Sequence, residues 1–256
     1  MCGIAGILGA PDPALLKRML EAQRHRGPDG EGSRVSGDLA LGAVRLAVLD
    51  RSALAHQPMA SSDGRFLLAY NGEIYNHGDL KTELEKEGES FRSSGDTETV
   101  LKALARWGEK ALERFNGVFA LAFWDAREKR LLLARDRVGV RPLYWAEAGG
   151  SVLFASEIKG ILASGRVRPA VDGAALAEIF RFQNVWSERT LFSGVLPVPP
   201  GSVLAFRDGQ VERRTWWRFS FPGDLRIGGK EAAEDGDDSL AATGAYQPGS
   251  DRKFPV

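Results

Sequence analysis

The sequence lacks the features of a disulfide-stabilised, membrane-spanning or nucleic-acid-binding protein. Only one of its 256 residues is cysteine, and no run of about 18 apolar residues occurs that would form a transmembrane helix. The 34 lysines and arginines equal the 34 aspartates and glutamates, so the zero net charge gives no electrostatic reason to expect a nucleic-acid or membrane partner. The apolar start at residues 1–10 has no basic lead-in and is too short for a secretory signal. We therefore expect a folded, cytoplasmic protein.

Several common catalytic motifs are missing as well. The chain has no Gly-x-x-x-x-Gly-Lys-Ser/Thr phosphate-binding loop and no Gly-x-Ser-x-Gly nucleophile elbow. The three histidines, His25, His56 and His77, form no His-x-His or His-Glu-x-x-His pair, and a lone cysteine adds no second sulfur ligand for zinc. The sequence therefore predicts no metal site and no cofactor in this chain.

The pattern of apolar residues indicates an α+β fold in which strands outnumber helices. Helices are expected from Pro13 to about Gln23 and over Asp79–Glu87, Thr97–Trp107, Ser156–Ala163 and Ala174–Phe182, with aspartates 12, 96 and 172 as N-caps. Strands are expected over Ile4–Leu8, Leu39–Leu49, Phe66–Tyr70, Val118–Trp124, Leu131–Arg135, Leu143–Ala146 and Val152–Ala155, and in a hairpin that joins Val203–Phe206 to Val211–Trp217. The near-regular spacing of the strands after residue 117 favours antiparallel pairing. The sequence thus predicts two antiparallel sheets with helices outside them.

The composition changes beyond about residue 225. Residues 228–256 contain only Leu240, Phe254 and Val256 among the large aliphatics and phenylalanine, and they carry an acidic cluster at residues 234–238. Such a segment cannot bury enough apolar surface to offset the entropy lost on ordering. We expect one folded domain over residues 2–225 and a disordered tail over residues 226–256.

The single cysteine stands at position 2, directly before an apolar strand. Removal of Met1 is expected before a small residue, and it would make Cys2 the N-terminus. An α-amino group with a pKa near ~7.7–8 can accept the thiol proton, so one residue would supply both nucleophile and base. The alternative is that Cys2 is a small residue at a flexible start. Gly3 and Gly6, which leave the backbone uncrowded, favour the nucleophile.

Seven short segments between residues 1 and 159 carry the remaining motifs. In chain order they read MCGIAG at 1–6, HRGPDG at 25–30, HQPM at 56–59, YNGEIYN at 70–76, SGDTE at 94–98, RDRVGVRPLY at 135–144 and ASEIK at 155–159. Together they resemble the class II glutamine amidotransferases, which are N-terminal-nucleophile (Ntn) hydrolases, and in particular the glutamine-hydrolysing asparagine synthetases. The resemblance covers about residues 2–217 and implies a four-layer α/β/β/α sandwich that hydrolyses L-glutamine to glutamate and ammonia.

The resemblance also implies a catalytic group and a carboxylate-binding group. Cys2 would attack the glutamine side-chain amide, and Asn71 with Gly72 would form the oxyanion hole for the tetrahedral intermediate. Arg45 matches the arginine that binds the substrate α-carboxylate, for which a planar guanidinium is suited. From the residues alone, Arg45 could instead be a solvent-facing strand arginine, and Asn71-Gly72 an ordinary turn.

The rest of the glutamine site follows from the same resemblance. Asp96 corresponds to the residue that receives the α-ammonium, although by itself it reads as a helix N-cap. Leu46, Val48 and Glu73 are expected to complete the substrate pocket. The motif residues Arg26 and Asp136 are interpreted as structural or interfacial, without a chemical role.

The resemblance implies a partner, because proteins of this family have a second domain after the segment that matches this chain. Asparagine synthetases continue into a second domain that binds ATP through a Ser-Gly-Gly-x-Asp-Ser loop, and no such loop occurs in this sequence. We expect the ammonia to pass to an ATP- and Mg-dependent synthetase domain or subunit, for amidation of aspartate or a related carboxylate. A homodimer is left open.

Two other functions compete with glutamine hydrolysis. One is a non-catalytic glutamine-sensing or docking module on the same scaffold, and the presence of Cys2, Asn71 and Gly72 speaks against it. The other is an amidase for amides other than glutamine. Arg45 and Asp96 favour glutamine, because they suit the two charges of a free amino acid.

Overall fold

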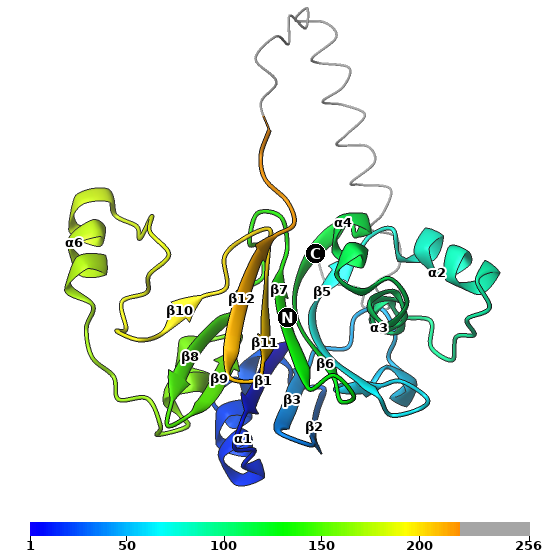
Figure 1. Ribbon diagram of the computed structural model, residues 1–256, viewed down its shortest axis with the longest axis horizontal. Coiled ribbons are helices and arrows are strands. Elements are labelled where there is room, and N and C mark those ends of the chain that lie inside the picture. Colours follow the sequence, from blue (N-terminus) through cyan, green and yellow to red (C-terminus); the bar gives the residue numbers. More distant parts are fainter. Residues whose placement is uncertain (221–256) are drawn as a thin grey trace, which may run out of the picture.

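The computed structural model of the chain describes residues 1–220, and within them the strands form two six-stranded antiparallel sheets (Figure 1). The first sheet has the order β10 (Leu196–Pro197), β8 (Tyr144–Ala148), β9 (Ser151–Ala155), β1 (Gly3–Leu8), β3 (Leu39–Arg45) and β2 (Gly30–Ser36). The second has the order β12 (Gln210–Thr215), β11 (Ser202–Arg207), β7 (Arg130–Arg135), β6 (Gly117–Asp125), β5 (Phe66–Ile74) and β4 (Met59–Ala60). The tail predicted over residues 226–256 lies outside the described residues.

Helices cover the outer face of each sheet. Side chains of α1 (Pro13–Glu21) and α5 (Ile158–Leu162) pack on the first sheet, and those of α2 (His77–Lys86), α3 (Asp96–Trp107) and α4 (Ala111–Arg114) pack on the second. The helix α6 (Gly173–Phe182) lies apart from both helix layers (Figure 1). None of the described helices is long and apolar enough to cross a membrane.

Side chains that alternate along the strands connect these layers. In β6, Phe119 and Phe123 pack under α3 and α4, whereas Ala120, Ala122 and Trp124 pack between the two sheets. A strand with period 2 therefore fills two cores, one on each of its faces. Because both sheets do this, the predicted four-layer α/β/β/α sandwich is confirmed.

The element boundaries differ from the predictions in two places near the later site. The strand predicted over Leu39–Leu49 ends at Arg45, and residues 46–50 form a loop. The strand predicted over Phe66–Tyr70 continues to Ile74, because residues 71–74 remain paired with β6. The reading of Asn71-Gly72 as an ordinary turn is therefore wrong.

The sequence analysis missed β2 and misplaced one helix cap. The β2 segment GEGSRVS has a single large apolar residue, and its pairing with β3 makes it a strand despite that composition. Asp96 does not cap α3 from outside: the N-cap is Gly95, and Asp96 is the first helical residue. Its carboxylate has other partners in the site.

Candidate active site

A small pocket of ≈ 120 Å³ opens where β1 begins, beside the ends of β3 and β5. All eight site residues expected from the sequence line it: Cys2, Arg45, Leu46, Val48, Asn71, Gly72, Glu73 and Asp96. They come from four separate parts of the chain. Met1, Asp50, Gln57 and Arg141 line the same pocket and were not expected there.

Cys2 presents its thiol to the loop that follows β3. Its Sγ lies 3.7 Å from the carbonyl oxygen of Leu46 and 3.4 Å from the backbone nitrogen of the same residue. Burial raises the pKa of the Cys2 thiol, and the hydrogen bond from Leu46 offsets this only in part. The resting thiol is therefore neutral, and a reaction at sulfur needs a base to remove its proton.

Asn71 points a buried, unused donor at this pocket. Its side chain is 1% exposed, and its amide nitrogen Nδ2 has no hydrogen-bond partner among the described residues. A buried donor without an acceptor costs about 1–3 kcal/mol, so such a group is uncommon unless a ligand completes it. The Asn71 amide can serve an oxygen bound in the pocket.

The backbone N–H of Gly72 points out of the edge of β5 that faces the pocket. In a strand, alternate N–H groups point to the same side. The N–H of Tyr70 donates to Gln57 Oε1 at 2.6 Å, and that of Ile74 donates to Asp96 Oδ2 at 3.0 Å. The Gly72 N–H lies between these two and points out of the same edge, toward the pocket.

The pairing of β5 with β6 gives the same direction for the Gly72 N–H. Phe119 stands across from Gly72 in β6. It donates its N–H to Asp136 Oδ2 at 3.2 Å and accepts the Asp136 N–H at 2.8 Å, so its polar groups face β7. Gly72 and Phe119 are therefore a non-hydrogen-bonded pair, and the Gly72 N–H turns away from β6. A Cβ at position 72 would lie 2.4 Å from the Val118 oxygen, so only glycine permits this close pairing.

Arg45 is held by the loop after β3 through an aspartate that the sequence analysis missed. The Arg45 guanidinium donates to the backbone oxygens of Asp50 and Ser52. The buried Asp50 carboxylate accepts from Ser52 N at 2.8 Å, Ser94 N at 2.9 Å and Ser94 Oγ at 3.1 Å. Burial works to raise the pKa of Asp50, but these hydrogen bonds outweigh it and lower the pKa to about 2. Asp50 thus ties the arginine loop to the segment before Asp96, and its spacing from Ser52 was the available signal, since it is typical of an Asx turn.

Asp96 is a buried carboxylate that lines the pocket. Its Oδ2 accepts from the Tyr70 hydroxyl at 2.7 Å and from the Ile74 N–H at 3.0 Å. Burial raises the pKa of Asp96 despite these bonds, and the pKa of Tyr70 lies well above its usual value for the same reason. Glu73, at the same pocket, also has a raised pKa, first from burial and then from repulsion by Asp96. This acidic end would be stabilised by a cationic group of a ligand.

The hydrogen-bonded loop after β7 brings Arg141 to the pocket. Asp136 accepts the N–H groups of Val138, Val140 and Arg141 at 3.2, 2.9 and 3.0 Å. Arg135 donates to the Arg141 oxygen at 2.7 Å from the other side. The interpretation of Asp136 as structural agrees with these backbone contacts, and the RDRVGVRPLY motif was the signal that Arg141 belongs to the site.

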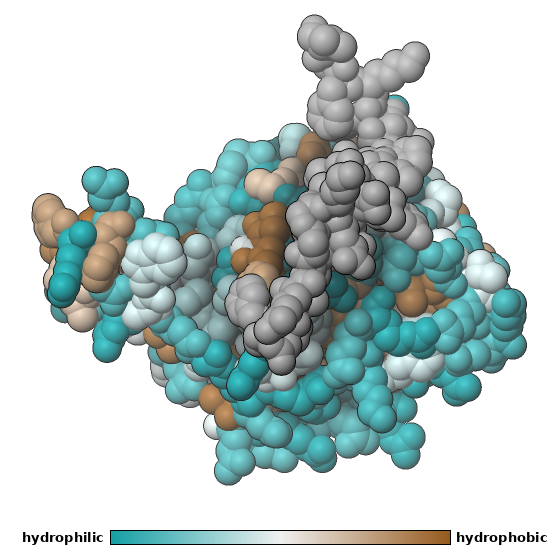
Figure 2. Space-filling model, turned by 90° about the horizontal axis from the view of Figure 1, so that it is seen from above, coloured by the Kyte–Doolittle hydropathy of each residue, from teal (hydrophilic) through white to brown (hydrophobic). Residues whose placement is uncertain are grey.

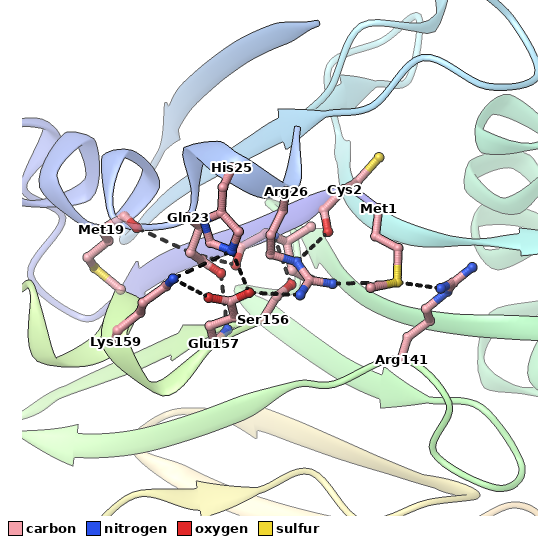
Figure 3. Close-up of polar contacts among 11 residues, drawn as sticks. Met1, Cys2, Met19, Gln23, His25, Arg26, Arg141, Ser156, Glu157 and Lys159 are labelled. Atoms are coloured by element: carbon pink, nitrogen blue, oxygen red, sulfur yellow. Dashed lines mark hydrogen bonds and ion pairs between the residues drawn. The ribbon is translucent and has the colours of Figure 1, made fainter. Parts of the chain in front are cut away.

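Arg26 anchors the start of the chain (Figure 3). Its Nε donates to the Cys2 oxygen at 2.9 Å, and its Nη1 pairs with Glu157 Oε1 at 2.9 Å. Glu157 is also held by His25 at 2.9 Å and Lys159 at 3.0 Å. Arg26 is therefore a buried structural residue, and it holds the backbone of Cys2 in place.

The described residues contain no group of three or more histidine, cysteine, aspartate or glutamate side chains arranged to hold a metal ion. The pocket instead offers a thiol, N–H donors, a guanidinium and carboxylates. These are the groups needed to bind an amino acid and attack its side-chain carbonyl. A family model for the glutamine amidotransferase domain matches residues 1–217. The chain belongs to this family.

This glutamine amidotransferase domain is similar to longer proteins. It is 36% identical over 225 residues to asparagine synthetase (glutamine-hydrolysing) 3 of Bacillus subtilis, which covers 84% of this chain and 36% of that protein. It is 31% identical over 241 residues to the amidase chyE of Penicillium rubens, covering 88% of this chain and 35% of that protein. The chain thus spans about a third of the length of these curated relatives.

A solved structure supports the fold assignment. The glutamine phosphoribosylpyrophosphate amidotransferase of Bacillus subtilis, complexed with ADP and GMP, matches with a TM-score of 0.65 at 22% identity. The match covers 84% of this chain and 49% of that one. The glutamine amidotransferase domain therefore has the Ntn-hydrolase sandwich.

Proposed function

We propose that this domain hydrolyses L-glutamine to glutamate and ammonia, with Cys2 as the nucleophile. The observation that carries the proposal is the buried Asn71 amide nitrogen, which has no partner among the described residues and lines the same pocket as the thiol. With the edge-facing N–H of Gly72, it forms a pair of donors for a carbonyl oxygen that gains negative charge.

The base in this mechanism is the α-amine of Cys2, freed by removal of Met1. Met1 lines the pocket, so its removal also enlarges the space for a substrate. The amine takes the thiol proton, and the thiolate adds to the glutamine side-chain carbonyl carbon. Asn71 and Gly72 donate to the resulting oxyanion.

Two further steps complete the reaction. The intermediate collapses, the C–N bond breaks, and the α-ammonium returns its proton to the departing ammonia. A water molecule, deprotonated by the same amine, then adds to the γ-glutamyl thioester and releases glutamate with the regenerated thiol. One glutamine and one water give one glutamate and one ammonia.

The two ends of the pocket match the two charges of glutamine. Arg45 is the proposed partner of the α-carboxylate, and the carboxylate of Asp96 is the proposed partner of the α-ammonium. Leu46, Val48 and Glu73 line the space between them and the thiol. A bound ammonium would favour the charged form of Asp96, whose pKa burial raises.

We further propose that the ammonia serves an ATP-dependent synthetase domain or subunit that amidates aspartate or a related carboxylate. Relatives at 33–36% identity are named asparagine synthetases, which supports this acceptor. ATP and Mg would be bound by that partner, and a cytoplasmic setting is proposed with it.

The test is ammonia release from glutamine by the purified chain, with its N-terminus defined by mass spectrometry. Cys2→Ala should abolish release while glutamine binding, measured by calorimetry, persists. A variant with extra residues before Cys2 keeps the thiol but lacks the free amine, and it should lose ~10²–10⁴-fold in turnover. A glutamine-like electrophile should add to Cys2.

Two outcomes would reject the mechanism. Normal turnover by the extended variant would exclude the α-amine as base. Tight glutamine binding by the wild-type chain without any turnover would instead identify a glutamine-sensing module.

A further inference from the structure

The two most exposed aromatic side chains of the described residues lie on α6 and the turn after it. Phe180 is 83% exposed and Trp186 is 76% exposed. Leu176, one helical turn before Phe180, and Phe182 are exposed as well. We call these four residues the α6 patch, and Figure 2 shows apolar residues gathered on the outlying lobe where α6 lies. A cluster of large apolar side chains in water is typical of an interaction surface.

The apolar face of the helix is only partly covered. Ala175 is fully buried and Ile179 is half-buried one turn later. Leu176 and Phe180 have the same spacing, continue the same face of the helix, and are exposed to solvent. A wide apolar face is typical of a helix that is buried along that face. In the described residues the part of the face that carries Leu176 and Phe180 is uncovered.

The α6 patch is held in a defined frame. Asp172 accepts two N–H groups of the first helical turn at 3.0 Å each, and Arg189 pairs with it at 3.0 Å. Glu178 accepts the N–H groups of Trp186 and Ser187 at 2.8 and 3.0 Å. Because the segment is already ordered by these bonds, a partner would meet a preorganised surface and lose little entropy in binding it.

The segment that follows Trp186 is hydrogen-bonded to the last described strand, β12. Glu188, two residues after Trp186, accepts two hydrogen bonds from Arg213 at 2.5 and 2.7 Å. Arg213 is on β12, the edge strand that ends at Thr215, five residues before the described chain ends at residue 220. In the Bacillus subtilis relative the matched part is only 36% of the protein. The rest of such a relative must be accommodated near this edge if it continues from the same strand.

We propose that the α6 patch is the docking surface for the ammonia-accepting, ATP-dependent domain. The inference rests on the proposed function, since it names where the acceptor of that ammonia binds. Ammonia is small and is lost to water by diffusion, so its transfer needs the two domains to stay in contact. Aromatic anchors at the centre of an interface provide such contact.

The experiment uses the purified chain and, as probe, the part of the Bacillus subtilis asparagine synthetase 3 that lies outside the matched region. Binding is measured by analytical ultracentrifugation and calorimetry. Phe180→Asp and Trp186→Asp should each weaken binding at least ~30-fold, as expected for central aromatic anchors. The matched control is Val35→Asp on β2, at a side chain that is 53% exposed and outside the α6 patch, and it should leave the affinity unchanged.

Glutamine hydrolysis by the free chain is measured in parallel, because neither substitution touches the pocket. Absence of glutamine hydrolysis by the wild-type chain would reject the proposed function. Normal hydrolysis without binding of the probe would reject only the docking surface. Binding that Phe180→Asp and Trp186→Asp leave intact would overturn the inference. Self-association abolished by the same substitutions would assign the α6 patch to a second copy of the chain and overturn it too.

Discussion

Different residues of the pocket are expected to bind glutamine and to act on its carbonyl. Arg45 would contact the substrate carboxylate in the ground state and the transition state alike, so Arg45→Ala should mainly raise KM. Asn71 would strengthen its hydrogen bond only when the oxyanion forms, so Asn71→Ala should lower kcat by ~10²–10³. Steady-state kinetics of glutamine hydrolysis measure both. An Asn71→Ala variant with weaker binding and normal kcat would remove Asn71 from the oxyanion hole.

Asp50 should act on binding without touching the substrate. Its carboxylate joins the loop of Arg45 to Ser94, and Asp50→Asn replaces one acceptor oxygen by a donor that faces the N–H of Ser52 or Ser94. We expect a rise in KM and a loss of about 1–3 kcal/mol in the free energy of unfolding, measured by urea titration. Asp63→Asn, in an exposed turn, is the control. Unchanged KM for Asp50→Asn would contradict the positioning role.

At the scale of elements, the close approach of β5 to β6 fixes the position of Gly72, a proposed oxyanion donor. A Cβ at Gly117 would lie 2.2 Å from the Glu73 oxygen and 2.8 Å from the Ile74 Cα, both in the backbone of β5. Gly117→Ala should therefore force the strands apart beside Gly72, lowering both the melting temperature and kcat. Gly78→Ala is the matched control, since a Cβ there meets nothing within 4 Å. Equal melting temperatures for the two variants would show that the strand pair tolerates the methyl group.

At the scale of the whole molecule, two carboxylates make stability depend on acid. Burial works to raise the pKa of Glu157, but hydrogen bonds from Arg26, Lys159 and His25 lower it to about 2, and the pKa of Asp50 is also about 2. Since both groups have higher pKa values when unfolded, the unfolded chain binds more protons between about pH 4.5 and pH 2. Each group contributes about 2–3 kcal/mol above that window, and the contribution is lost as the pH falls through it.

The measurement is the free energy of unfolding from pH 7 to pH 2. The difference between the wild type and Glu157→Gln should stay level above about pH 5 and shrink below it, because the raised pKa values of Asp96 and Glu73 affect both proteins alike. Glu157→Gln should be less stable at neutral pH and should lose less stability on acidification. If the free energy of unfolding depended on pH in the same way in this variant and in the wild type, the Arg26–Glu157 contact would not contribute to acid sensitivity.

The sequence by itself determined the layers and most of the site. Strands such as β6, with apolar residues on both faces, require a core on both sides, which agrees with the sandwich that the resemblance implied. A lone cysteine at position 2, together with the motifs around Asn71 and Asp96, was sufficient to identify the residues that the pocket brings together. Site residues can be predicted from the sequence where they lie within a recognisable motif.

Only the tertiary structure decided the direction and the partners of the site groups. The direction of the Gly72 N–H depends on which residue of β6 stands opposite, and a shift by one residue would reverse it. The link from Asp50 to Ser94 and the arrival of Arg141 at the pocket join segments far apart in the chain. The exposure of Phe180 could not be read from its apolar helix either, because the pattern says that a side chain is apolar, not whether a neighbour covers it. Alternation fixes the face of a side chain within its own element, whereas partners and register come from packing between elements.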